Sequence, residues 1–139
     1  SSRQEYEKSI LALLKKEKID LVVLAGYMLM LGKGLVKEYL QKIINIHPAL
    51  LPCFKGMHAI EDAYHAGVKI TGVTVHFVDE EMDNGPIIAQ SPVFISNSDS
   101  LEDLEKKIHE TEHIMYPKVV EDFCNERIKV KGPRAFIKY

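Results

Sequence analysis

The sequence predicts one α/β domain in which helices cover a parallel sheet, and three patterns lead to this prediction. Residues 21–25 (LVVLA) form an unbroken apolar run, which is typical of a strand buried on both faces. Residues 72–78 alternate between two faces, as a half-polar strand does. Apolar residues recur at intervals of three and four over 4–18 and 100–124, which is the period of helices with one buried face.

Length and composition limit the class of protein. A chain of 139 residues, 46% of them apolar, is long enough for one domain with a real core. The formal net charge of −2 lacks the basic excess of a nucleic-acid-binding protein, and no apolar run reaches the roughly 20 residues that span a bilayer. Cys53 and Cys124 lack metal-ligand spacing and are best explained as reduced thiols. We therefore expect a cytoplasmic protein that acts on small molecules and binds no metal.

The first half of the chain predicts two helices and two strands. The helix over 4–18 has one apolar face, which consists of Tyr6, Ile10, Leu13 and Leu14. After the strand at 21–25, the run from Tyr27 to Leu31 is too apolar for a free loop. It is either a buried connection or an apolar wall for a flat ligand. A short helix, with Leu35, Val36, Tyr39 and Leu40, then leads into a strand over 43–47.

The second half predicts a short helix over 59–66 that ends at Gly67, and then the alternating strand over 72–78. The prolines in 86–90 and 92–95 favour one or two strands at a sheet edge. The long helix over 100–124 opens on Ser-Leu-Glu-Asp, which approximates a capping box, and Pro117 should kink or divide it. The basic tail over 128–139 suggests no function.

The stretch Asn45-Ile46-His47-Pro48 places an amide and an imidazole two residues apart at the end of an apolar strand. Side chains of a strand alternate, so Asn45 and His47 should point to one face while Ile44 and Ile46 pack behind them. Pro48 favours an extended His47 and helps to end the strand. Polar groups at the carboxyl end of a strand are where α/β proteins commonly place their chemistry.

Asp83 is the expected third member of this group, in a loop with Asp79, Glu80 and Glu81. If the strands over 43–47 and 72–78 are parallel neighbours, that loop can fold over the end of the first strand. Amide, imidazole and carboxylate suit acyl or formyl transfer to an amine. Asn45 and a protonated His47 would stabilise the oxyanion, and Asp83 would take up the proton directly or through water. With no Ser or Cys in the pattern, direct transfer is favoured over a covalent intermediate.

The long helix carries two further candidate features. Residues 109–113 (HETEH) match the zinc-protease motif, but the angular count places His109 and His113 on a solvated face, and no third ligand is evident. We therefore discount a zinc hydrolase. Glu112 falls inside the apolar stripe, where a carboxylate is costly unless it is paired or used. It is either a site residue or is turned to solvent by the kink.

Taken in order, residues 45–52, 54–56, 72–78 and 82–90 strongly resemble the phosphoribosylglycinamide formyltransferase family. The resemblance runs from about Arg3 to the end of the long helix. It implies a three-layer, Rossmann-like formyltransferase fold with a mostly parallel central sheet. It also implies transfer of a formyl group from 10-formyltetrahydrofolate to the amine of glycinamide ribonucleotide, in purine biosynthesis, without a metal. The family's catalytic Asn, His and Asp correspond to Asn45, His47 and Asp83.

The resemblance implies further contacts. The reduced folate would meet an apolar wall and an acidic loop, which comprise Met28, Leu29, Met30, Leu31, Val36, Asp79, Glu80 and Glu81. The residues that match positions near the bound substrates are Arg3, His58 and Glu112, with Glu112 on the ribonucleotide side. Leu29 stands where the family often has Arg, Ala49 where it usually has Ser, and Asn84 where it usually has Gly.

The family begins with a strand and a G-x-x-S-N loop that grips the ribonucleotide phosphate, and residues 1–20 match neither. We therefore expect a partial, N-terminally truncated formyltransferase domain over 1–139. The isolated chain should bind folate better than ribonucleotide and have little transferase activity. A relative with another acceptor, such as water or methionyl-tRNA, or a catalytically silent folate-binding module would also explain the sequence.

Overall fold

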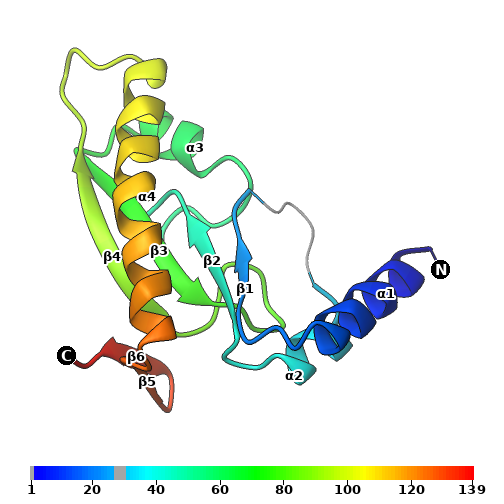
Figure 1. Ribbon diagram of the computed structural model, residues 1–139. Helices are drawn as coiled ribbons and strands as arrows, with labels where there is room; N and C mark the ends of the chain where they lie inside the picture. The colour runs from blue at the N-terminus through cyan, green and yellow to red at the C-terminus, as the bar shows by residue number, and fades with distance from the viewer. Residues whose placement is uncertain (1, 27–30) are drawn as a thin grey trace.

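The computed structural model describes residues 2–26 and 31–139 of the chain (Figure 1). The elements it describes, in order, are α1 (Ser2–Lys16), β1 (Val22–Leu24), α2 (Lys33–Glu38), β2 (Ile43–His47), α3 (Ala59–Ala66), β3 (Ile70–Phe77), β4 (Ile87–Phe94), α4 (Leu101–Cys124), β5 (Ile128–Lys131) and β6 (Arg134–Ile137). None of these helices is long and apolar enough to cross a membrane.

The main sheet is mixed, with the strand order β1-β2-β3-β4. β1 pairs parallel with β2, as expected, but β2 pairs antiparallel with β3, and β3 antiparallel with β4. The prediction that the strands over 43–47 and 72–78 run parallel is therefore wrong, and the described sheet is not mostly parallel. Alternation along a strand shows which residues share a face, but the direction of the neighbour depends on how the connection returns. The α/β class and the edge position of β4 are confirmed.

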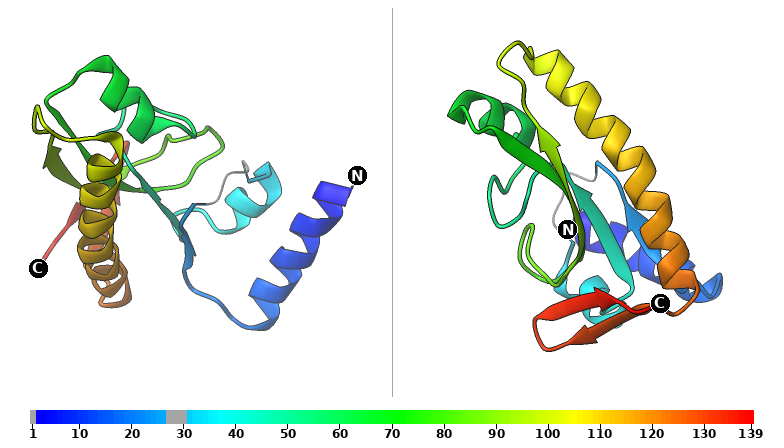
Figure 2. Two further views of the ribbon diagram at one scale, coloured as in Figure 1. Left: turned by 90° about the horizontal axis from the view of Figure 1, so that it is seen from above. Right: turned by 90° about the vertical axis from the view of Figure 1, so that its left-hand side faces the viewer.

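Helices pack on both faces of the sheet. On one face, α4 contributes Leu104, Ile108 and Val119 to a core with β2, β3 and β4 residues such as Ile44 and Val75. On the other, Leu35 and Tyr39 around α2 pack with Ile43, and half-buried residues of α1 and β1 join them. Figure 2 shows α4 along the sheet and α1 and α2 on the other side. The face that Ile43 shares with Asn45 and His47 is the face of the site.

Two segments expected to be buried are more open than predicted. α1 has no fully buried residue, since Ile10 and Leu14 are half-buried against α2 while Tyr6 is 54% and Leu13 56% exposed. Figure 1 shows α1 projecting away from the sheet. In β1, Val22 and Leu24 are half-buried and Val23 is 44% exposed, so neither face of this strand is fully covered.

Local chemistry sets the other boundaries. α3 ends at Gly67, which adopts the left-handed conformation (φ 73°) that glycine favours. The capping box of α4 is confirmed, because Ser100 and Asp103 exchange side-chain and backbone hydrogen bonds. Pro117 was expected to kink or divide this helix, and α4 continues through it undivided. The tail without an assigned function forms the hairpin β5–β6.

Candidate active site

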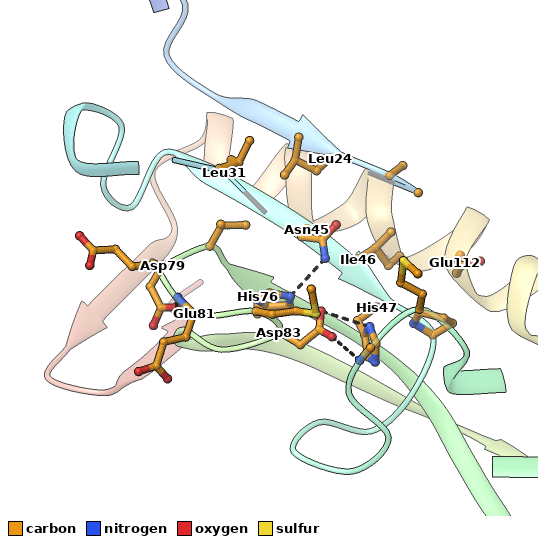
Figure 3. A pocket seen from close by; sticks show the side chains of 18 of the residues that line it. Leu24, Leu31, Asn45, Ile46, His47, His76, Asp79, Glu81, Asp83 and Glu112 are labelled. Atoms are coloured by element: carbon orange, nitrogen blue, oxygen red, sulfur yellow. Dashed lines mark hydrogen bonds and ion pairs between the residues drawn. The ribbon is translucent and has the colours of Figure 1, made fainter. Parts of the chain in front are cut away.

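A cavity of about 360 Å³ opens where β1 and β2 end and where the loop between β3 and β4 folds back (Figure 3). Its apolar walls include Leu24, Leu31, Ile46, Val78 and Met82. Its polar lining comprises Asn45, His47, His76, Asp79, Glu80, Glu81, Asp83, His109 and Glu112. A mostly apolar cleft with a few convergent polar groups is the usual form of a small-molecule site.

His47 and Asp83 lie together in this cavity, as predicted. The imidazole of His47 is buried at 3% exposure, and its Nδ1 lies 3.4 Å from Asp83 Oδ1. Its Nε2 lies 2.8 Å from the carbonyl oxygen of Phe54. Because a carbonyl only accepts, Nε2 carries the hydrogen of that bond. The ring is thus held between a backbone acceptor and a carboxylate, with Asn45 two residues earlier on the same face.

The route by which Asp83 reaches His47 differs from the expected one. β3 ends at Phe77, opposite Ile44 near the start of β2, so the loop after β3 must return along β2 to bring Asp83 to His47. Two positive φ angles shape this return, 50° at Asp83 and 104° at Gly85. A Cβ at Gly85 would meet the Phe77 carbonyl oxygen at 2.1 Å, so the close approach requires glycine. The Gly56 amide donates to Asp83 Oδ2 at 2.6 Å and fixes the carboxylate.

His76 is a member of the site that the sequence did not single out. It lies directly opposite Asn45 in the β2–β3 pairing. Its Nδ1 lies 2.8 Å from the Phe77 carbonyl oxygen and therefore carries hydrogen, which leaves Nε2 free to accept from Asn45 Nδ2 at 3.4 Å. Burial lowers the pKa of His76. A neutral His76 thus orients the Asn45 amide and leaves its second N–H for another acceptor.

The α4 side of the cavity carries Glu112 and His109. Glu112 Oε1 lies 2.7 Å from His109 Nδ1, and the Glu112 side chain is 18% exposed. Glu112 thus faces the cavity rather than open solvent. His109 is 59% exposed, as the angular count predicted, yet it also reaches the cavity, which that count could not show. In the part of the chain that the structure describes, no group of three or more His, Cys, Asp or Glu could hold a metal ion.

The remaining predicted site residues divide into three groups. Leu31 and the acidic loop residues Asp79, Glu80 and Glu81 line the cavity. Val36 is 1% exposed and sits in the core, and Arg3 and His58 are exposed, so these three lie outside the described lining. The predicted wall residues Met28, Leu29 and Met30 lie outside the described residues.

The charged residues of the cavity lining are mostly acidic. Five carboxylates, those of Asp79, Glu80, Glu81, Asp83 and Glu112, belong to the lining. No Lys or Arg occurs among the described residues that line it. An anionic ligand group would therefore find no Lys or Arg partner among these lining residues.

Residues 1–120 match the family model described as formyl transferase. Phosphoribosylglycinamide formyltransferase of Bacillus subtilis is 48% identical over 134 residues, which cover 96% of this chain and 68% of that protein. The enzyme of the same name from Haemophilus influenzae is 39% identical over 137 residues, which cover 99% of this chain and 65% of that protein. The chain thus spans about two thirds of the length of these relatives.

Solved structures agree with the sequence relatives. Phosphoribosylglycinamide formyltransferase from Anaplasma phagocytophilum superimposes with a TM-score of 0.90 at 43% identity, covering 95% of this chain and 65% of that one. A formyltetrahydrofolate deformylase from Pseudomonas syringae superimposes with a TM-score of 0.89 at 33% identity, covering 95% of this chain and 44% of that one. The fold is therefore shared by proteins whose names give them different acceptors.

Proposed function

This chain belongs to the formyl transferase family, and we propose that it carries the catalytic centre for formyl transfer from 10-formyltetrahydrofolate to the amine of glycinamide ribonucleotide, a step of purine biosynthesis. The observation that supports this most directly is the buried His47–Asp83 pair beside Asn45 in an apolar-walled cavity. The choice of acceptor in this proposal comes from the names of the relatives, which are phosphoribosylglycinamide formyltransferases.

In the proposed reaction the amine nitrogen attacks the formyl carbon and the carbonyl electrons move onto oxygen. Asn45 Nδ2–H and His47 Nε2–H are the donors that we assign to this oxyanion, in a position shielded from bulk water. Asp83 accepts the proton from the attacking nitrogen, directly or through water. When the tetrahedral intermediate collapses, the bond from carbon to the folate nitrogen breaks, and that nitrogen takes the proton that Asp83 accepted, directly or through water.

The existing hydrogen bonds constrain how this happens. His47 Nε2–H donates to the Phe54 carbonyl in this structure, so the loop over 53–56 must release that hydrogen as the substrate binds. The Gly56 amide of the same loop donates to Asp83 Oδ2, while Asp83 Oδ1 faces His47. His47 Nε2–H thus has to exchange the Phe54 carbonyl for the oxyanion during the reaction, whereas Asp83 already lies beside His47.

The folate and the acceptor take different sides in this proposal. The apolar residues Leu24, Leu31 and Val78, with the loop over 79–83, suit a flat pterin whose polar edge meets backbone groups. Glu112 on α4 suits the hydroxyls of a ribonucleotide. We propose that the group that anchors the ribonucleotide phosphate lies outside the cavity lining described here, because that lining holds five acids and no Lys or Arg.

A deformylase is the second candidate, because a structure of that name shares the fold at 33% identity. In that reaction water takes the place of the amine and formate leaves. Asn45, His47 and Asp83 would serve the same roles, so the acceptor side of the cavity decides between the two reactions. A silent folate-binding module is the third.

The test compares formylated acceptor with free formate, both produced from 10-formyltetrahydrofolate, for the 139-residue chain and for a chain extended at its N-terminus. We expect transfer by the extended chain, little by the shorter one, and losses of about 10²- to 10³-fold on Asn45→Ala, His47→Ala or Asp83→Ala. Formate without acceptor product would favour the deformylase. Folate binding without either product would favour the silent module. Rapid transfer by the 139-residue chain would contradict the expected division of the acceptor site.

A further inference from the structure

One row of side chains crosses three neighbouring strands at the level of His47. The sheet register places Thr74 of β3 opposite His47 of β2, and Gln90 of β4 opposite Thr74. Thr74 is fully buried, at 0% exposure, and neither Thr74 nor Gln90 belongs to the described cavity lining. The row therefore extends from the site into the sheet.

The Thr74 hydroxyl has every hydrogen-bonding position filled. It donates to the Ala49 carbonyl at 2.7 Å and accepts from the Leu51 amide at 3.1 Å and from Gln90 Nε2 at 3.1 Å. A hydroxyl has one hydrogen and two lone pairs, so this set is complete. Such a buried and saturated network holds its members in one arrangement.

Gln90 closes the same network from the edge strand. Its Nε2 also donates to the Leu51 carbonyl at 3.0 Å. Leu51 thus has its amide bound to Thr74 and its carbonyl bound to Gln90. Leu50 packs close against Gly72, where an added Cβ would lie 2.5 Å from Leu50 Cδ2. The backbone over 49–51 is fixed by side chains of two strands that carry no catalytic group.

We propose that Thr74 and Gln90 are positioning residues that hold the loop over 48–52 and thereby fix the adjacent His47 at the site. The segment between His47 and Phe54 is short, and its middle is the part that Thr74 and Gln90 bind. A shift of this loop would move Pro48 in the cavity wall and the carbonyl that accepts from His47 Nε2. The expected effect on kcat rests on the proposed formyl transfer, whereas the effect on the loop and on His47 does not.

The test uses Thr74→Val, which keeps the shape and removes the hydroxyl, with Thr74→Ser as the matched control that retains it. Hydrogen exchange of the Leu51 amide and the imidazole NMR signals of His47 are measured in the 139-residue chain. Formyl transfer is measured in the extended chain. We expect Thr74→Val to speed Leu51 exchange at least tenfold, to shift the His47 signals and to lower kcat by about 10- to 100-fold with little change in the folate KM. Thr74→Ser should stay close to the parent protein.

Gln90→Met provides a second variant if Thr74→Val does not fold, because Gln90 lies on an edge strand and is exposed. It should change the same readouts in the same direction and less strongly. Unchanged Leu51 exchange and His47 signals in either folded variant would overturn the positioning role, as would equal losses in Thr74→Val and Thr74→Ser. If the extended chain with the parent sequence transfers no formyl group, the proposed function fails, and the exchange and NMR results still decide the role of Thr74 and Gln90.

Discussion

The protonation state of His76 decides what the neighbouring amide can do. Nδ1–H is committed to the Phe77 carbonyl, so only a bare Nε2 can accept from Asn45 Nδ2. A proton on Nε2 would place two donors 3.4 Å apart and turn the Asn45 amide away. Burial lowers the pKa of His76 most strongly, and the nearby charge of His47 lowers it further, while hydrogen bonds and Asp83 act in the opposite direction.

This lowered pKa predicts a pH dependence of stability. Below the unfolded pKa of about 6.5 the unfolded chain binds a proton at His76 that the folded chain rejects, so folding stability falls as pH falls until the folded pKa is reached. His76→Gln, whose amide oxygen can still accept, should remove this contribution. Urea unfolding at pH 7.5 and pH 5 should therefore show a smaller acid loss for His76→Gln than for the parent protein. His65→Gln on exposed α3 is the matched control, and equal losses in all three proteins would contradict the prediction.

At the residue scale, the site was predictable where it depends on local pattern. Alternation in the strand over 43–47 placed Asn45 and His47 on one face, and the acidic loop together with the family motif indicated Asp83. His76 was missed because its role depends on the β2–β3 register, which no local pattern contains. His109 was judged solvated, which is correct for most of its surface, but the cavity reaches that side of α4.

At the scale of elements, Asp122 joins α4 to the C-terminal hairpin. Its carboxylate is fully buried and lies 2.8 and 2.9 Å from Lys118 Nζ, 3.2 Å from Arg127 and 3.1 Å from the Tyr139 hydroxyl. Burial alone would raise the pKa of Asp122, but the hydrogen bonds from these three partners outweigh it and hold that pKa below its usual range. The tail that suggested no function thus supplies one partner, Tyr139, to a buried charge.

Asp122→Asn should destabilise the fold at neutral pH, because two cationic partners lose their carboxylate. Hydrogen bonds to a charged group typically contribute about 1.5–3 kcal/mol each, and the partial exposure of Lys118 and Arg127 favours a loss at the lower end. A depressed carboxyl pKa contributes stability above the unfolded value of about 3.9 and loses it as pH falls through the folded value. The difference between Asp122→Asn and the parent protein should therefore be full at pH 7 in urea unfolding and shrink at pH 3. Glu121→Gln, on the exposed side of α4, is the control, and an equal difference at both pH values would point to packing instead of charge.

Elements were predictable to the extent that short-range chemistry defines them. The strand at 43–47, the helix over 59–66 with Gly67 and the capped start of α4 all follow from neighbours in sequence. Pro117 was expected to kink or divide α4. It does not divide the helix, because it lies on an exposed part of it, where water can satisfy the carbonyl that loses its partner. The hairpin β5–β6 was missed because the contacts of Asp122 with Arg127 and Tyr139, on either side of the hairpin, form only in the folded chain.

At the scale of the whole molecule, the wrong strand direction did not prevent the correct grouping of the site. Both parallel and antiparallel pairing put Asn45 and His47 on the face where the loop over 79–86 can lie. In the structure the loop is the β3–β4 hairpin connection, which doubles back over β2. The direction in which β2 and β3 pair depends on the path of the long connection over 48–69. The face of the sheet to which a side chain points depends only on its position in its own strand.

The distribution of charge around the cavity leads to a prediction about substrate binding by the 139-residue chain. Five carboxylates line the cavity, and its described lining contains no Lys or Arg to offset them, so a phosphate on the acceptor gains no attraction there. We expect calorimetry to give glycinamide ribonucleotide and its dephosphorylated riboside Kd values within about threefold of each other, whereas a gripped phosphate would separate them by at least tenfold, or about 1.4 kcal/mol. Raising the salt concentration from 0.05 to about 0.5 M should weaken the repulsion and improve ribonucleotide binding relative to riboside binding. Binding of the ribonucleotide ten times more tightly than the riboside, with that advantage lost in salt, would show that these 139 residues already contain the phosphate anchor.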